Sequence, residues 1–246
     1  MQQPMLIIHY HIFKNAGTSL DVMLRNNFGD RWAEAEFDEA KPSEYTNSAR
    51  VTEFLRERPD LVTLSSHTAQ LPLPQLKREI LPVFFIRHPL DRLKSAYAFE
   101  RVQEADTHGA LLAKDHDFAG YVRHLLGDPR FRQARNFQTR RLADFEPPER
   151  GSERERALRA LDSLPFVGLV EAYGRSIERL AAQLAPHFPG FKPEALHENR
   201  TDGREEDLEE RVAAIRNLLP DAFFEELLQA NADDFAVYET VKAKYA

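Results

Sequence analysis

The sequence predicts an α/β fold in which a central, mostly parallel sheet is covered by helices on both faces. Four short segments rich in β-branched, aromatic and aliphatic residues have the length and composition of buried strands: 6–12, 61–65, 83–86 and 166–170. Segments with apolar residues at helical spacing alternate with them, which is typical of parallel sheets. Prolines stand at the edges of the proposed elements, at Pro59, Pro72, Pro74, Pro82 and Pro89.

The helical patterns come in two groups. Those between and after the strands cover residues 17–28, 90–102, 117–127, 154–163 and 173–185, and a helical tail follows at 205–218 and 220–232. No long polar linker interrupts the 246 residues. We therefore expect one domain, residues 1–246, with a helical C-terminal segment at 204–246.

Composition narrows the class of protein. Hydrophobic residues make up 42% of the chain and aromatic residues 10%, enough for a substantial core. The absence of cysteine excludes disulfides, thiolate nucleophiles, zinc ribbons and iron–sulfur ligation. The apolar run at 5–8 is far shorter than a membrane span, so we expect a soluble, cytoplasmic protein without a membrane anchor. A net charge of −7 argues against nucleic acid as a partner.

The turn after the first predicted strand has the outline of an anion-binding cradle. Ligands of parallel sheets bind beyond the carboxyl ends of the strands, where this turn lies. Backbone N–H groups at a helix start point toward an anion, Gly17 permits close approach, and Thr18 and Ser19 add hydroxyl donors. Lys14 supplies a full charge but precedes the glycine by three residues, unlike a Walker A lysine. The alternative is an ordinary capped strand-to-helix turn.

The turn after the third predicted strand carries a second set of anion-binding side chains. Arg87 leaves the end of the strand, Pro89 starts a helix, and Ser95 lies two helical turns further on. An arginine at a strand end offers a planar fork to a phosphate, and a helix-borne serine can donate to the same group. In the alternative interpretation Arg87 pairs with Asp91 and Ser95 faces solvent.

Together the two turns resemble the binding elements for 3′-phosphoadenosine 5′-phosphosulfate (PAPS) in the sulfotransferase superfamily. Arg87 with Ser95, eight positions apart, is similar to the family's 3′-phosphate pair. The first turn is similar to its 5′-phosphosulfate loop, which would comprise Lys14, Asn15, Ala16, Gly17, Thr18 and Ser19. The resemblance implies a P-loop-like three-layer fold, PAPS as co-substrate and no metal.

Further segments resemble the carbohydrate branch of that superfamily, which includes the heparan and dermatan 2-O-sulfotransferases. Ser66-His67-Thr68 is similar to the histidine-bearing segment of that branch, and Asn136-Phe137-Gln138-Thr139-Arg140 to its N-x-Q-T-R stretch. The resemblance runs in order from about residue 7 to about residue 180. Asn15 and Ala16 stand where the family usually has threonine or glycine. The eukaryotic carbohydrate enzymes also carry membrane anchors and disulfides, so the resemblance supports the chemistry better than it supports a glycan acceptor.

The resemblance assigns a role to each matched residue. Lys14 would neutralise charge on the bridging oxygen of the leaving group, while Thr18 and Ser19 would hold the 5′-phosphate. His67, at the end of a strand, would be the general base for an acceptor hydroxyl. His9 and His11 lie on one face of the first strand, and we expect them to be structural.

Two other classes of function stay open from the residues alone. A P-loop-like nucleotide kinase or hydrolase would use the same cradle, although its lysine is misplaced and no clear Walker B carboxylate is visible. A noncatalytic module would bind an anionic glycan or protein through an arginine-rich segment, which could equally be a solvated helix face. That segment contains Arg123, Arg130, Arg132, Arg135, Arg140 and Arg141. The acceptor of a transferase, whether a hydroxyl or an amine, is not identified by the sequence.

Overall fold

A computed structural model of the chain describes residues 4–41, 44–193 and 207–245, and within them it contains a five-stranded sheet. The strand order is β2-β3-β1-β4-β5 and every pairing is parallel. The strands are β1 (Leu6–Tyr10), β2 (Trp32–Glu34), β3 (Thr63–Ser66), β4 (Ile80–Ile86) and β5 (Val167–Leu169). The predicted α/β fold with a parallel sheet is confirmed. Strand β2, three residues at the sheet edge, was not predicted because it has no apolar run.

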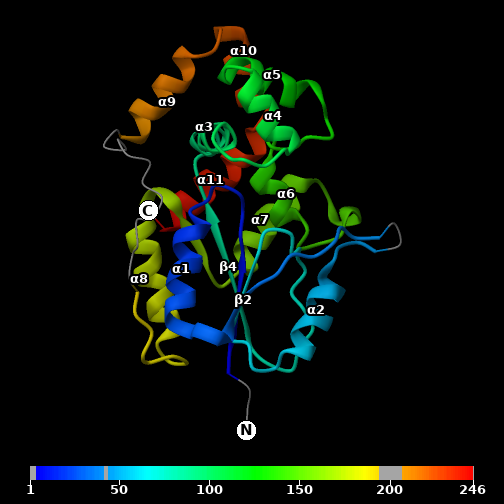
Figure 1. Cartoon of the computed structure of the whole chain (residues 1–246), viewed down its shortest axis with the longest axis vertical. Helices are drawn as coiled ribbons and strands as arrows, with labels where there is room; N and C mark the ends of the chain where they lie inside the picture. Colours follow the sequence, from blue (N-terminus) through cyan, green and yellow to red (C-terminus); the bar gives the residue numbers. More distant parts are fainter. Residues whose placement is uncertain (1–3, 42–43, 194–206, 246) are drawn as a thin grey trace.

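Helices cover both faces of the sheet, as alternation along the strands requires. Leu6, Ile8 and Tyr10 of β1 pack into a core with α2 (Ser48–Glu57), α6 (Phe137–Ala143), α7 (Glu153–Ser163) and α11 (Ala232–Tyr245). Ile7, on the opposite face, packs into a second core with α1 (Gly17–Phe28) and α8 (Tyr173–Leu184). Figure 1 shows α1 and α8 on one side of the strands and α2 on the other.

A group of helices with its own apolar core lies above the carboxyl ends of the strands (Figure 1). It contains α3 (Pro89–Glu100), α4 (His108–Asp115), α5 (Phe118–Gly127), α9 (Leu208–Asn217) and α10 (Asp221–Ala230). Short 3₁₀ segments stand at Gly29–Arg31, Pro148–Arg150 and Val170–Ala172. None of the helices in the described ranges is both long and apolar enough to cross a membrane.

The predicted helices are largely confirmed, with bounds that agree within two residues for α1, α3, α5, α7, α8 and α10. Helix α9 begins at Leu208; residues 204–206 and 246 of the predicted C-terminal helical segment lie outside the described residues. Three helices were not predicted: α2, α4 and α6. Helix α11 lies within the predicted C-terminal helical segment, although no separate helical pattern was identified for it. Helix α11 follows α10 after the single residue Asn231, so the sequence pattern shows no break there. Helix α6 has few apolar residues and lies in the arginine-rich segment, so its helical pattern is weak. The single domain stays a prediction.

A buried carboxylate joins α11 to α6. Asp234 is fully buried and accepts hydrogen bonds from the backbone N–H of Gln138 at 3.2 Å and of Thr139 at 2.7 Å. The Thr139 hydroxyl donates to it at 2.7 Å. Because these N–H groups belong to the first turn of α6, where no intrahelical partner exists, Asp234 fixes the start of that helix.

We predict that Asp234→Ala lowers the free energy of unfolding by about 3 kcal/mol, because it leaves three buried donors without an acceptor. Urea denaturation followed by circular dichroism measures this. Glu239→Ala, an exposed position on the same helix, is the control and should change stability by less than about 0.5 kcal/mol. Equal effects of the two substitutions would contradict the role given to Asp234.

Candidate active site

The parallel strands bring the three predicted turns to one edge of the sheet. Lys14 follows β1, His67 follows β3, and Arg87 follows β4, and β1 lies between β3 and β4. These turns come together as the sequence predicted. Glu36 after β2 and Glu171 after β5 join the same edge, although neither was singled out from the sequence.

The loop between β1 and α1, residues 11–16, has an unusual backbone. Lys14 has φ 65° and Ala16, the N-cap of α1, has φ 60°, so two non-glycine residues adopt the left-handed conformation. Each such residue costs roughly 1–3 kcal/mol unless its surroundings hold it there. A glycine would adopt the Ala16 conformation without this strain, because it has no Cβ.

Buried hydrogen bonds hold this loop. The side-chain N–H₂ of Asn15, which is 1% exposed, donates to the carbonyl of Phe85 at 2.6 Å and to Oε1 of Gln138 at 2.7 Å. Gln138 also exchanges hydrogen bonds with Arg87: its Oε1 accepts from the backbone N–H at 2.9 Å and its Nε2 donates to the carbonyl at 2.8 Å. One glutamine on α6 therefore connects the loop to the end of β4.

Arg87 is buried and paired. Its Nη1 donates to the carbonyl of Lys14 at 2.8 Å and its Nε to Oδ2 of Asp91 at 2.8 Å. Asp91 is also bonded by Arg211 of α9 at 3.1 Å. The pairing of Arg87 with Asp91 that the sequence left open is thus present. Ser95 is half-exposed on α3, and no hydrogen bond joins it to Arg87 in the described residues.

The candidate donor-binding side chains differ in exposure. Thr18 is exposed and Ser19 is buried in the first turn of α1. The Lys14 ammonium lies 4.3 Å from the centre of the Phe99 ring, a cation–π contact. Burial, and then the Arg87 guanidinium, lower the pKa of Lys14 from its ordinary value. An anion that binds beside Lys14 should therefore raise its pKa more than it would raise that of a solvated lysine.

The His67 turn is held from both sides. The Glu36 carboxylate accepts from the backbone N–H of His67 at 3.0 Å and from the N–H and hydroxyl of Thr68 at 2.9 and 2.6 Å. Arg141 of α6 donates to the carbonyls of His67 and Ala69, both at 2.9 Å. Burial and the neighbouring His11 lower the pKa of His67, against the opposing charge of Glu36. The imidazole is therefore neutral, as a base must be, at neutral pH.

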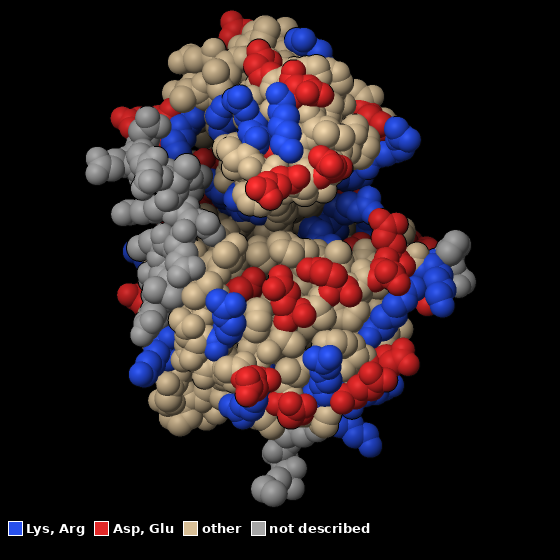
Figure 2. All heavy atoms as spheres, in the orientation of Figure 1, with Lys and Arg blue, Asp and Glu red and all other residues tan. Residues whose placement is uncertain are grey.

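A pocket of about 310 Å³ opens beside His67. Its wall contains two histidines, two phenylalanines and four arginines of the arginine-rich segment: His11, Ile12, Phe13, His67, Arg130, Arg132, Phe137, Arg140 and Arg141. Figure 2 shows Lys and Arg side chains along the hollow between the upper helices and the sheet. Arg130 pairs with Asp128 and Arg132 with Glu153, whereas the side chain of Arg140 makes no hydrogen bond or ion pair among the described residues. Part of the segment therefore lines a cavity, where Arg132 and Arg141 are partly buried and Arg130 and Arg140 are exposed to solvent.

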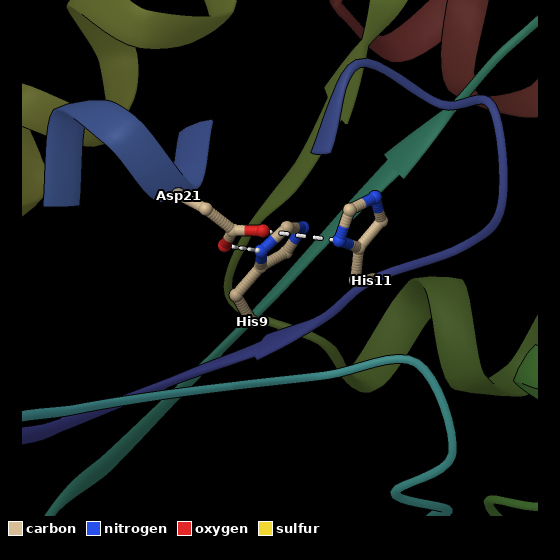
Figure 3. A group of neighbouring side chains, drawn as sticks. All are labelled: His9, His11 and Asp21. Atoms are coloured by element: carbon tan, nitrogen blue, oxygen red, sulfur yellow. Dashed lines mark hydrogen bonds and ion pairs between the residues drawn. The ribbon is translucent and has the colours of Figure 1, made fainter. Parts of the chain in front are cut away.

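Two histidines and an aspartate form a cluster next to this pocket. Asp21 of α1 uses one carboxylate oxygen for Nδ1 of His9, at 2.7 Å, and the other for Nδ1 of His11, at 3.0 Å (Figure 3). Glu34, Glu36 and His67 form a second polar group. Groups of this composition are also used for divalent cations. In the cluster of His9, His11 and Asp21, both Nδ1 atoms already bond the Asp21 carboxylate, so we assign no metal ion to that cluster.

Gly17 packs against the His11 imidazole. A Cβ on Gly17 would lie 2.0 Å from Nε2 of His11, far inside contact distance. The sequence predicted that Gly17 permits close approach of a phosphate, but the close neighbour in this structure is the histidine ring. The glycine is therefore required by the protein's own packing.

Sequence reasoning missed several residues that shape the site. Gln138 was noted only as part of a motif, and Glu36 and Asp21 were not noted. Each acts through a contact with a residue distant in sequence, for which no local pattern exists. The shared face of His9 and His11 was visible, but their common partner was not.

Comparison with known proteins identifies the family. Residues 1–240 match the sulfotransferase family, so the chain belongs to that family. The chain is similar to a protein of Archaeoglobus fulgidus described as uncharacterized, with 37% identity over 247 residues, 98% of this chain and 97% of the relative. Family membership supports sulfuryl transfer among the classes of function that the sequence left open. It does not select the carbohydrate branch.

We predict different effects on stability for substitutions at Ala16 and Gly17, where the β1–α1 loop meets α1. Gly17→Ala should destabilise the protein by about 1–3 kcal/mol, because its methyl group overlaps the His11 ring. Ala16→Gly should be tolerated, because it relieves a left-handed alanine. Thermal unfolding measures both.

A double variant tests the cause of the first effect. If His11 is the obstacle, His11→Ala combined with Gly17→Ala should cost less than the sum of the two single substitutions. Additive losses would show that Gly17 is required for another reason.

Proposed function

We propose that this sulfotransferase takes the sulfuryl group from PAPS and transfers it to a hydroxyl-bearing acceptor in the pocket beside His67. The observation that carries the proposal is the β1–α1 loop, held in a strained conformation with Lys14 at the carboxyl edge of a parallel sheet. Strain of this kind persists where surrounding contacts fix a geometry that function requires. Family membership and the location of His67 support the same interpretation.

On the donor side, the loop and the start of α1 would bind the 5′-phosphosulfate. Free N–H groups at the helix start and the Thr18 hydroxyl suit a phosphate, and Lys14 would neutralise charge on the bridging oxygen. Arg87 and Ser95 would bind the 3′-phosphate. Because Arg87 already pairs with Asp91, that phosphate would share the guanidinium with the carboxylate. We propose that no metal takes part.

On the acceptor side, the chemistry is an in-line displacement at sulfur. The acceptor oxygen forms a bond to sulfur while the bond from sulfur to the phosphate oxygen breaks, and adenosine 3′,5′-bisphosphate leaves. The acceptor's proton passes to the neutral His67 imidazole. Positioning and charge neutralisation therefore supply most of the catalysis.

The pocket supports an anionic acceptor with a ring. The Arg140 side chain makes no hydrogen bond or ion pair among the described residues, although Asp144 is a neighbouring negative charge. Arg130 and Arg141 stand in the same wall, so an acidic group would find charge-assisted donors. Phe13 and Phe137 offer flat apolar surface for a sugar ring. A carbohydrate with a carboxylate or sulfate is the acceptor that we favour, and we place the reaction in the cytoplasm.

We predict that the protein binds adenosine 3′,5′-bisphosphate at least about tenfold more tightly than AMP, because one charge-assisted hydrogen bond to the 3′-phosphate contributes roughly 1.5–3 kcal/mol. Titration calorimetry measures both affinities. Ser95→Ala is the cleaner probe, since Arg87 also holds the loop: it should weaken the bisphosphate and leave AMP unchanged. Equal affinity for the two nucleotides would remove the case for a 3′-phosphate site.

Lys14→Ala should abolish turnover and leave the fold intact, because the lysine side chain is half-exposed and its contact with Phe99 is weak. Turnover with labelled PAPS and thermal unfolding measure the two outcomes. Lys77→Ala, at an exposed position, is the control and should behave as wild type. Normal turnover in folded Lys14→Ala would overturn the mechanism.

His67→Ala should lower kcat by about 10²–10⁴-fold with nucleotide affinity nearly unchanged, as expected for loss of a general base. In the wild type the rate should fall as pH falls through the pKa of His67, which lies below the ordinary imidazole value, because protonation removes the base. This acid limb should vanish in the variant. His187→Ala, exposed in the chain after α8, should keep it. A persisting acid limb in His67→Ala would place the base elsewhere.

A further inference from the structure

His11 contacts three parts of the proposed site, although the function proposed above gives it no role. Its Nδ1 lies 3.0 Å from Asp21 of α1. Its ring centre lies 3.8 Å from that of His67, with 30° between the ring planes. Its Nε2 edge lies against Gly17, the first residue of α1, and the side chain lines the proposed acceptor pocket.

Asp21 fixes the orientation of this imidazole. Burial raises the pKa of Asp21, but the imidazoles of His9 and His11 outweigh burial and leave that pKa well below its usual range. The carboxylate is therefore ionised at neutral pH, and each Nδ1 that bonds it must carry a proton. Burial lowers the pKa of His11 despite Asp21, so its Nε2 is an unprotonated acceptor beside the donor loop.

The contact between the two imidazoles limits their charge. Two protonated rings at this separation repel each other, and His11 lowers the pKa of His67 in addition to burial. The other charged groups that face His67 are Asp21 of α1, Glu34 at the end of β2 and Glu36 after β2. Arg141 of α6 bonds its backbone carbonyl.

We propose that His11, oriented by Asp21, is a positioning residue that sets the placement of the His67 imidazole and packs the β1–α1 loop against the start of α1 at Gly17. The proposal rests on the proposed role of His67 as base. A single buried histidine then couples the acceptor side of the reaction to the loop that carries Lys14. The hydrogen bond that Nδ1 of His11 donates to the Asp21 carboxylate makes this a fixed contact, because it restricts rotation of the His11 ring.

His9 provides a matched comparison within the same cluster. It donates through Nδ1 to the same carboxylate at 2.7 Å and is 1% exposed. Its ring stacks on His11 with centres 4.9 Å apart, and no ring contact between His9 and His67 is present in the described part of the chain. If losing either histidine beside Asp21 disturbs His67, substitutions of His9 and of His11 should have the same effect. If His11 positions the His67 ring, only the substitution of His11 should have an effect.

The test compares His11→Asn with His9→Asn, because the asparagine amide can replace Nδ1 as donor to Asp21 while removing the ring. NMR titration of the His67 imidazole should show a raised pKa in His11→Asn and the wild-type value in His9→Asn. Turnover of PAPS by His11→Asn should fall between about 10- and 100-fold, the range that small misplacements cost, with its acid limb moved to higher pH. An unmoved His67 titration in His11→Asn, or equal shifts in both variants, would overturn the proposal.

A measurement on the wild-type protein keeps the proposal testable if the variants do not fold. Nitrogen-15 NMR of the imidazoles should show His11 with its proton on Nδ1, and His11 and His67 should titrate as a coupled pair. Independent titration, or a proton on Nε2 of His11, would contradict it. These readouts need no turnover. Absence of bisphosphate binding or sulfuryl transfer by the wild type would overturn the proposed function, whereas uncoupled imidazoles would overturn this inference alone.

Discussion

The left-handed backbone at Lys14 and Ala16 is the constraint on which the rest of the site depends, because two non-glycine residues stay there only if buried contacts hold them. Asn15 and the Lys14 carbonyl provide those contacts, to Gln138 and to Arg87. Gln138 in turn is placed by α6, whose first turn is fixed by Asp234 of α11. A chain of buried hydrogen bonds thus runs from the last described helix to the loop that presents the lysine.

The two sides of the proposed reaction are built differently. The donor side consists of backbone N–H groups, hydroxyls and one lysine, which suit a phosphosulfate of fixed shape. The acceptor side consists of arginines, aromatic rings and the neutral His67, which suit an anionic acceptor that must lose a proton. His11 stands between them, in contact with Gly17 and with His67. Such a division fits displacement at a sulfur atom with donor and acceptor on opposite sides.

The sequence predicted the parallel sheet and the three turns because both follow from local patterns: apolar runs form strands, and the polar residues after parallel strands meet at one edge. It could not predict what holds the turns. The bond from Asn15 to Gln138 joins residues 123 positions apart, and Glu36 reaches the His67 turn across 31 positions. For Arg87 the residues allowed two interpretations, and only the structure shows the pairing with Asp91. His9 and His11 were expected to be structural. They share Asp21 as a partner, and the His11 ring also contacts that of the candidate base His67.

Transfer of the sulfuryl group is the central claim about this protein. PAPS labelled with sulfur-35 in the sulfuryl group, incubated with the protein and a panel of sulfated and carboxylated oligosaccharides, gives the most direct measurement. The account predicts that label moves to an acceptor hydroxyl with one adenosine 3′,5′-bisphosphate formed per group transferred, and that chelators do not prevent it. Label that stays on PAPS, or that is released only as free sulfate with every acceptor, would contradict it.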